Sequence, residues 1–287
     1  MGTFVEVSLA GDYSDDDLIE LSQQAFAAID AVDAAMSFHC PDSELSRLNK
    51  LAFQQSVEVS QAMQHVLECA LDLSARTQGV FDVSVAPQLV SRGLLPNHNF
   101  SEVANGCWKD IELCDGRVRF HEPVLLDFGG IAKGYAVDRV FDLLEFNELS
   151  VVVNAGGDMR MSHWQGEKVA VRHPANPGQL VELAMRRQSV ATSGHYFLNS
   201  SSDKITDESA PAIVARQTGL EVRTQAQFET NDELVAFDGS VSVFSDSCML
   251  ADALTKVAML SSTPNDSVAR SGGELLMLPS RIEPPYL

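Results

Sequence analysis

The sequence predicts one α+β domain in which mixed β-sheets are flanked by helices, and three observations lead to this prediction. Segments with the two-residue alternation of strands and segments with the 3.6-residue period of helices are intermixed along the chain. The chain has 287 residues, of which 45% are hydrophobic, enough for one large core or two smaller ones. No internal repeat and no clean linker divides it, so we expect a single domain over residues 1–287.

The first part of the chain is predicted to be mainly helical. Alternating residues indicate a half-buried strand at 3–9, and apolar stripes with capping residues predict helices at about 15–35, 41–49 and 61–76. A looser passage follows to about residue 105. Residues 108–120 then form a predicted hairpin, because Asp115-Gly116 is a typical two-residue turn between alternating segments.

The second part is predicted to be mainly strands with two further helices. Residues 122–128 are interpreted as a short buried strand, and a helix is expected from Ile131 to about Leu149. Residues 198–238 are polar and poorly periodic, and we expect mostly loop there with one or two short elements. The remaining predicted elements are strands at 151–158, 168–172, 180–185, 240–244 and 273–278, and a helix at 249–260.

Composition excludes some classes of function. The formal net charge of −20 argues against nucleic-acid binding, which needs clustered Lys and Arg, and against adsorption to an anionic membrane. No apolar run approaches the roughly 18 to 20 residues of a membrane span, and the N-terminus lacks a signal pattern. We therefore expect a cytoplasmic protein as the chain stands, or a periplasmic or membrane-anchored one if a leader has been removed. The five scattered cysteines are expected to be free or buried thiols.

The segment 127–138 (DFGGIAKGYAVD) is the strongest candidate for a binding site. Gly129 and Gly130 stand where a predicted strand meets a predicted helix, so the backbone there can approach a ligand. The first N–H groups of such a helix attract an anion, and Lys133 adds a positive charge beside it. A tight turn with a solvated lysine explains the same residues, and the segment alone leaves both interpretations open.

Several further motifs occur in one order along the chain. They are residues 1–3 (MGT), 41–49 (PDSELSRLN), 80–82 (VFD), 127–136 (DFGGIAKGYA), 154–158 (NAGGD), 191–194 (ATSG) and 247–254 (SCMLADAL). This series resembles the ApbE family, the FAD:protein FMN transferases, over nearly the whole chain. The fold that the resemblance implies is a single ApbE-like domain.

The resemblance implies a reaction. Members of the family split FAD at its pyrophosphate with the help of magnesium, transfer FMN to a Thr or Ser of an acceptor protein, and release AMP. The metal position would involve the Gly130 carbonyl, the Asp252 carboxylate and the residue at position 256, here a lysine. FAD would contact Met1, His39, Val80, Phe81, Asp82, Asp127, Lys133, Asp158, Thr192, Ser193 and Ile205. The alternative to FAD contact is core packing for the apolar residues of this set, and a turn or helix-cap role for its aspartates.

The chain departs from the family at the metal. The family has a threonine four residues after the metal-binding aspartate, but Lys256 follows Asp252 at that spacing here. Residues four apart share one helix face, whereas Thr255 is turned about 100° away. A lysine ammonium cannot ligate magnesium. We therefore predict that Lys256 pairs with Asp252, occupies the metal position and makes magnesium bind poorly.

A second departure concerns the catalytic residues. The family's histidine after the 191–194 motif corresponds to Lys204, which is protonated at neutral pH and suits anion binding better than proton abstraction. His195 is the other catalytic candidate, as a substitute base or as a structural histidine. Three functions thus stay open: an FMN transferase, a family member that binds FAD without transferring FMN, and an FAD pyrophosphatase.

Overall fold

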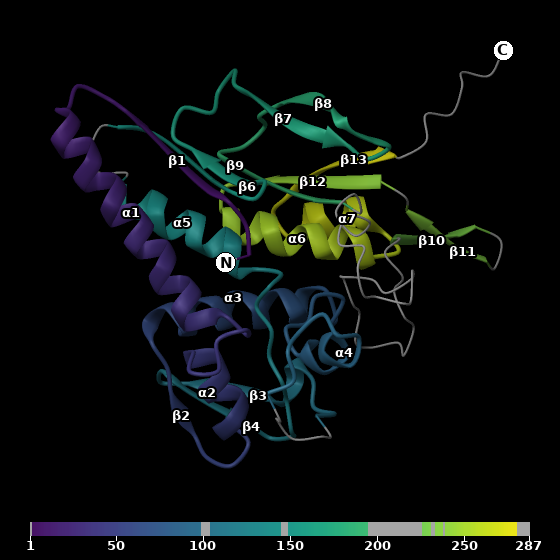
Figure 1. Ribbon diagram of the computed structural model, residues 1–287. Coiled ribbons are helices and arrows are strands. Elements are labelled where there is room, and N and C mark those ends of the chain that lie inside the picture. The colour runs from purple at the N-terminus through teal and green to yellow at the C-terminus, as the bar shows by residue number, and fades with distance from the viewer. Residues whose placement is uncertain are drawn as a thin grey trace.

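The structure is a computed structural model that describes residues 2–98, 104–144, 149–194, 226–230, 233–237 and 239–279; of 226–230, 233–237 and Pro177 it describes only the backbone. Its largest sheet is antiparallel, with the strand order β1-β5-β6-β9-β12-β13 (Figure 1). The strands are β1 (Val5–Ala10), β5 (Ser150–Ala155), β6 (Asp158–Met161), β9 (Ser189–Gly194), β12 (Gly239–Ser245) and β13 (Glu274–Pro279).

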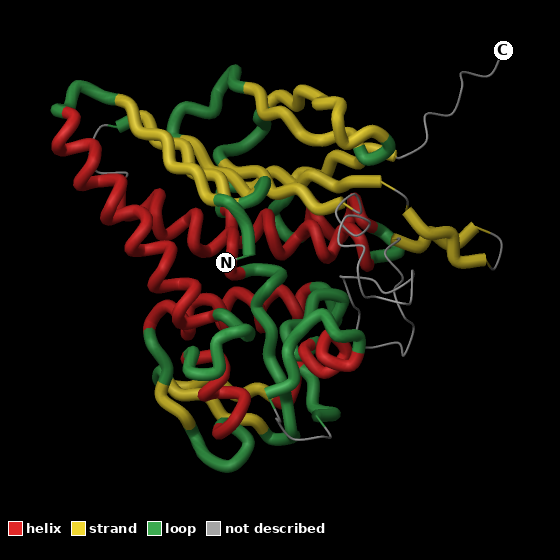
Figure 2. The backbone as a smooth tube through the Cα atoms, viewed as in Figure 1, coloured by secondary structure: helices red, strands yellow, loops and turns green. Residues whose placement is uncertain are grey.

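Helices cover one face of this sheet, and a hairpin covers the other (Figure 2). The helices are α1 (Asp15–Met36), α5 (Ala132–Leu144) and α6 (Cys248–Leu260), and the hairpin is β7 (Lys168–His173) with β8 (Asn176–Ala184). Ile29 of α1, Val140 of α5 and Val153 of β5 belong to one buried cluster on the helical side. Val169 and Phe244 belong to another cluster on the hairpin side. Each face of the sheet therefore packs against a buried hydrophobic cluster.

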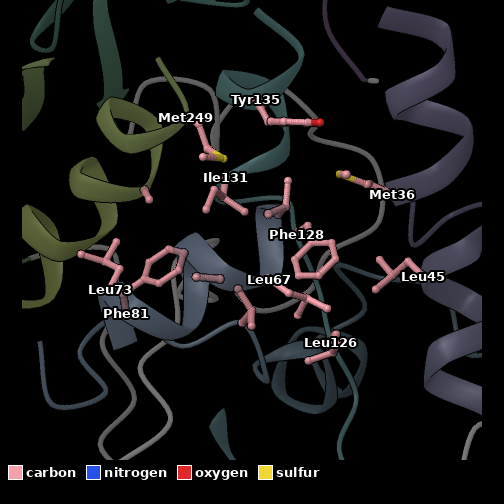
Figure 3. Packing of buried hydrophobic residues seen from close by; sticks show 14 of the residues in the cluster. Met36, Leu45, Leu67, Leu73, Phe81, Leu126, Phe128, Ile131, Tyr135 and Met249 are labelled. Atoms are coloured by element: carbon pink, nitrogen blue, oxygen red, sulfur yellow. The ribbon is translucent and has the colours of Figure 1, made fainter. Parts of the chain in front are cut away.

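A second part of the molecule lies beyond the helices. It contains α2 (Glu44–Leu51), α3 (Gln61–Arg76), α4 (Ala86–Ser91), the turn η1 (Trp108–Asp110) and a sheet of β2 (Val57–Glu58), β4 (Arg117–Phe120) and β3 (Ile111–Cys114). Its core is continuous with α6 and β12, because Leu67, Phe128, Leu254 and Val241 belong to one cluster. Figure 3 shows Phe128 and Ile131 among these packed side chains. The common core supports a mixed α+β architecture, as predicted.

Local sequence explains where the helices begin. Ser14 caps α1 by accepting a hydrogen bond from the Asp17 N–H. Three aspartates in the first turn stabilise the helix further, because their negative charge lies at the positive end of the helix dipole. Ser43 and Ser60 cap α2 and α3 in the same way. The hairpin turn at Asp115-Gly116 has positive φ at both residues, as a type I′ turn requires.

One sequence prediction was wrong in detail, and another extends beyond the described residues. Residues 122–128, expected to be a strand, do not pair in a sheet, although Val124, Leu125 and Leu126 are buried. The Leu126 N–H and carbonyl bond the Asn49 side chain, so a side chain satisfies this backbone in place of a neighbouring strand. The helix expected to reach Leu149 is described only to Leu144.

Some elements had no signal in the sequence. The short elements α4, β2 and α7 (Pro264–Arg270) were not predicted, and the strand expected at 151–158 is divided by the Gly156-Gly157 turn into β5 and β6. The hairpin of β10 (Ala226–Thr230) and β11 (Glu233–Phe237) agrees with the expected short elements within 198–238. No helix of the described residues is long and apolar enough to cross a membrane.

Candidate functional site

The Gly129-Gly130 turn leads directly into α5. Asp127 is held on both sides: its N–H donates to the Val83 carbonyl over 2.8 Å, and its Oδ2 accepts from the Gly129 N–H over 3.0 Å. Phe128 is fully buried below the turn. The two neighbours of Phe128 in the chain therefore stay at the surface of the core, where a ligand can reach them.

Four charged side chains from three elements meet beside this turn. Lys133 of α5 places its Nζ 2.8 Å from Asp158 Oδ2 and 3.1 Å from Asp252 Oδ2. Lys256 forms an ion pair with Oδ1 of the same Asp252, and its Nζ also lies 3.1 Å from the Asp252 carbonyl. The predicted pairing of Asp252 and Lys256 on one face of a helix is confirmed. We call Lys133, Asp158, Asp252 and Lys256 the charge cluster.

Burial within the charge cluster is uneven. The Asp252 side chain is completely buried and that of Asp158 is 4% exposed, whereas Lys133 and Lys256 are 29% and 17% exposed. Gly134 adds a backbone N–H to Asp252 Oδ2 over 3.2 Å. The carboxylates thus form the inner side of the cluster, and the ammonium groups form its accessible side.

These contacts shift the pKa values of the cluster. Burial alone would raise the pKa of Asp252, but the ammonium groups of Lys133 and Lys256 outweigh burial and lower it. Burial raises the pKa of Asp158, with the charge of Asp252 acting in the same direction. Burial opposes the charge of Lys133, yet Asp158 and Asp252 raise its pKa overall. Burial also raises the pKa of Asp127. Asp252 is therefore ionised and Lys133 is protonated at neutral pH.

A cavity of about 440 Å³ opens next to the charge cluster. Its lining includes nine of the residues that the sequence analysis singled out: His39, Val80, Phe81, Asp82, Asp127, Gly129, Gly130, Lys133 and Lys256. A further apolar part of the lining comes from Val32, Met36, Phe38, Leu89, Leu94 and Leu95. The cavity therefore combines an extended apolar wall with glycine backbone and two ammonium groups.

The aspartates at the cavity also have the structural roles that the sequence left open. Asp82 Oδ1 accepts hydrogen bonds from the Ser84 N–H and the Ser84 hydroxyl, over 2.8 and 2.6 Å. Asp127 fixes the glycine turn as described above. Both carboxylates hold local turns and line the cavity, so the two interpretations do not compete.

Other predicted residues lie outside the cavity lining. Thr192 shares a 2.8 Å hydrogen bond with Ser242, and Ser193 shares one of the same length with Thr255. Asp158 and Asp252 lie behind the lysines and do not line the cavity. The FAD contacts expected of Thr192, Ser193 and Asp158 stay predictions. Met1, His195, Lys204 and Ile205 lie outside the described residues.

The charge cluster does not suit a magnesium ion in the described arrangement. Both oxygens of Asp252 already bond ammonium groups, and Oδ2 also accepts from the Gly134 backbone. Thr255, the nearby hydroxyl, points to β9, where it bonds Ser193. Among the described residues, no group of three or more His, Cys, Asp or Glu side chains is arranged to hold a metal ion.

Sequence reasoning missed part of this site. The apolar wall of the cavity was not foreseen, because Val32 and Met36 continue the buried stripe of α1 and look like ordinary core residues. Lys133 was expected beside a phosphate, without its two carboxylate partners. Because Asp158 and Asp252 are far from Lys133 in the sequence, no local pattern predicts that they pair with it.

Comparison with known proteins identifies the family. The model of the ApbE family matches residues 1–271. The "FAD:protein FMN transferase" of Escherichia coli K12 is 24% identical over 220 residues, covering 68% of this chain and 62% of that protein. The protein of the same name from Haemophilus influenzae is 28% identical over 224 residues, covering 68% and 64%. The chain thus matches less than two thirds of the length of these two relatives.

Solved structures share the fold. The flavin transferase ApbE from Vibrio cholerae superimposes with a TM-score of 0.71 at 23% identity, covering 96% of this chain and 90% of that one. The ApbE protein from Thermotoga maritima gives a TM-score of 0.74 at 22% identity, covering 96% and 91%. At this level of identity the likeness concerns the fold alone, whereas the family model extends along most of the sequence. This chain belongs to the ApbE family.

Proposed function

We propose that this chain is an FAD:protein FMN transferase, which binds FAD in the cavity and transfers FMN to a Thr or Ser of an acceptor protein. The observation that carries the proposal is the two-part cavity, with an apolar wall and a polar end at Gly130, Lys133 and Lys256. FAD has the same two parts, because its flat ring systems are apolar and its pyrophosphate is an anion. The names of the related proteins support the same assignment.

The transfer needs a hydroxyl nucleophile and a leaving group. The acceptor hydroxyl oxygen forms a bond to the phosphorus of the FMN half, the bond from that phosphorus to the bridging oxygen breaks, and AMP leaves with the bridging oxygen. The hydroxyl proton passes to a base, for which His195 is the candidate from the sequence, whereas a protonated Lys204 would bind a phosphate oxygen. The ammonium groups of Lys133 and Lys256 would stabilise negative charge that develops on the phosphates.

A second function is favoured by one observation. Lys256 pairs with Asp252 where the resemblance to the family implies a metal ion. If the transfer depends on that ion, the chain would hold FAD without transferring FMN. A pyrophosphatase, in which water replaces the acceptor hydroxyl, would face the same difficulty.

One experiment separates these functions. The protein is incubated with FAD and an acceptor protein that carries a known flavinylation site, with magnesium or with EDTA. Mass spectrometry is expected to detect FMN on the acceptor and AMP in solution, and an acceptor whose target Thr or Ser is replaced by Ala is the control. Free FMN with AMP would instead identify a pyrophosphatase, and bound but intact FAD would identify a binding protein. Absence of any FAD binding would contradict the proposal.

A further inference from the structure

Lys256 occupies the space between the two groups that the family resemblance assigns to the metal. Its ammonium pairs with Asp252 on one side. On the other side its stem passes the Gly130 backbone, where a Cβ placed on Gly130 would lie 3.5 Å from Lys256 Cε. Lys256 also lines the cavity. A cationic group that belongs to the chain therefore stands where the resemblance implies an exchangeable ion.

Displacing this lysine would be unfavourable. Asp252 is completely buried, and a buried carboxylate is costly when it loses a partner. A divalent ion next to the Asp252 carboxylate would also repel the ammonium groups of Lys133 and of the displaced Lys256, which would both remain nearby. Thr255 is the hydroxyl residue of α6, and its side chain points to β9, where it bonds Ser193. It is therefore not placed to bind a metal ion if Lys256 moves away.

The two lysines still offer positive charge to the cavity. An ammonium group has three N–H donors. Lys256 directs its donors to the carboxylate and the carbonyl of Asp252, and Lys133 directs its own to Asp252 and Asp158. Both side chains keep an exposed fraction and line the cavity. Lys256 contacts two acceptors, so it can present its third donor to a phosphate oxygen while it keeps Asp252 as its partner. Lys133 contacts three carboxylate oxygens and contributes mainly its charge.

We propose that Lys256 is a built-in replacement for the divalent cation, so that the cavity binds the pyrophosphate of its nucleotide without a metal ion. This inference rests on the proposed function, because FAD supplies the pyrophosphate. Two ammonium groups and two carboxylates balance in charge, so the cluster attracts the pyrophosphate less strongly than one that holds a divalent ion. Magnesium neither assists nor competes at this position.

The first test measures metal binding without FAD. Mn²⁺ serves as the probe, and its binding to the wild type, Lys256→Thr and Lys256→Met is followed by electron paramagnetic resonance. The threonine restores a hydroxyl ligand, whereas the methionine removes the charge and supplies no oxygen. We expect Mn²⁺ to bind Lys256→Thr at least about tenfold more tightly than the wild type or Lys256→Met. Equal binding by the wild type and Lys256→Thr would overturn the proposal.

The second test measures FAD affinity by the quenching of flavin fluorescence, in EDTA and in magnesium. The wild-type dissociation constant is expected to differ by less than about twofold between the two conditions. Lys256→Met should weaken binding about tenfold or more in both, and Lys256→Thr should weaken it in EDTA and recover in magnesium. Lys168→Thr, at an exposed ion pair on β7, is the matched control and should behave as the wild type.

The outcomes distinguish this inference from the proposed function. Wild-type FAD binding that EDTA abolishes and magnesium restores would overturn the inference and leave the proposed function intact. Wild-type protein that binds no FAD in either condition would overturn both. Metal-independent binding that Lys256→Met leaves unchanged would show that Lys256 does not contact the pyrophosphate, and would also overturn the inference.

Discussion

At the level of single residues, two buried carboxylates depend on the charge of Lys133. Lys133 is the only residue that contacts both Asp158 and Asp252 in the described charge cluster, over 2.8 and 3.1 Å. Asp252 has a second ammonium partner in Lys256. Asp158 lies 96% buried with Lys133 as its ion-pair partner among the described residues. Loss of Lys133 would therefore affect Asp158 most.

Lys133→Met should destabilise the protein in a pH-dependent manner. Burial already raises the pKa of Asp158, and Lys133 opposes that rise, so the variant should raise this pKa further. An acid whose folded pKa lies above its unfolded value loses stabilising free energy as the pH rises between the two values. Wild type and variant lose the same free energy up to about pH 6, the wild-type pKa of Asp158, so the extra deficit of the variant should grow above that pH and reach about 1 kcal/mol near pH 7. Urea unfolding, followed by tryptophan fluorescence at several pH values, measures it.

The matched control for this variant is Lys168→Met. Lys168 forms an exposed ion pair with Glu182, and such pairs contribute little to the free energy of unfolding. We expect a change below about 0.5 kcal/mol for the control at every pH. A deficit of Lys133→Met that stays constant between pH 4 and pH 7 would contradict the assigned role of Asp158.

At the level of elements, the site depends on the close approach of α5 and α6. Asp138 of α5 accepts hydrogen bonds from the Cys248 and Met249 N–H groups, both over 2.9 Å, so its carboxylate caps the N-terminus of α6. Arg160 of β6 completes this joint with an ion pair to Asp138 over 2.8 Å. Gly134 is the point of closest approach, since it has no side chain to separate the helices. The joint places Lys133 opposite Asp252.

Gly134→Ala should disrupt this joint. A Cβ at Gly134 would lie 2.6 Å from the Cys248 carbonyl carbon and 2.7 Å from the Met249 Cα, so backbone atoms would have to move. We expect the free energy of unfolding to fall by about 1 to 3 kcal/mol, the usual cost of overpacking. FAD binding should weaken as well, because Lys133 would move away from Asp252.

Gly178→Ala is the control for this prediction. Gly178 is exposed on β8, and an added Cβ would make only an ordinary contact with Asn176 over 3.5 Å. Its free energy of unfolding should change by less than about 0.5 kcal/mol. Similar urea unfolding curves for Gly134→Ala and Gly178→Ala would show that the two helices tolerate a wider spacing.

At the level of the whole molecule, the cavity collects segments from distant parts of the chain. Met36 of α1, Phe81, the 127–133 segment and Lys256 of α6 all line it. Figure 1 shows α1, α5 and α6 between the large sheet and the part that contains α2 and α3. Both parts of the molecule therefore contribute to the site.

The sequence predicted those features that local patterns encode. Apolar stripes located α1 and α3, and capping residues indicated α2. The Asp115-Gly116 turn set the register of β3 and β4, and the spacing of Asp252 and Lys256 determined their pairing. An apolar run was a poor predictor of a strand where the backbone groups of the run do not pair with a neighbouring strand. Residues 122–128 are as apolar as a strand, but Asn49 and Val83 satisfy their backbone groups. Contacts between distant segments, such as that of Lys133 with Asp158, have no local pattern.

A ligand in this cavity should stabilise the whole fold. Because the folded cavity binds FAD and the unfolded chain does not, FAD at about 100 times its dissociation constant should add about 2.7 kcal/mol to the free energy of unfolding. Leu95→Trp places a larger side chain in the cavity lining and should abolish this stabilisation. Leu143→Trp, at an exposed position on α5 outside the lining, is the control and should keep it. Thermal unfolding with and without FAD measures both. If FAD protects Leu95→Trp as well as the control, the flavin nucleotide binds elsewhere on the protein.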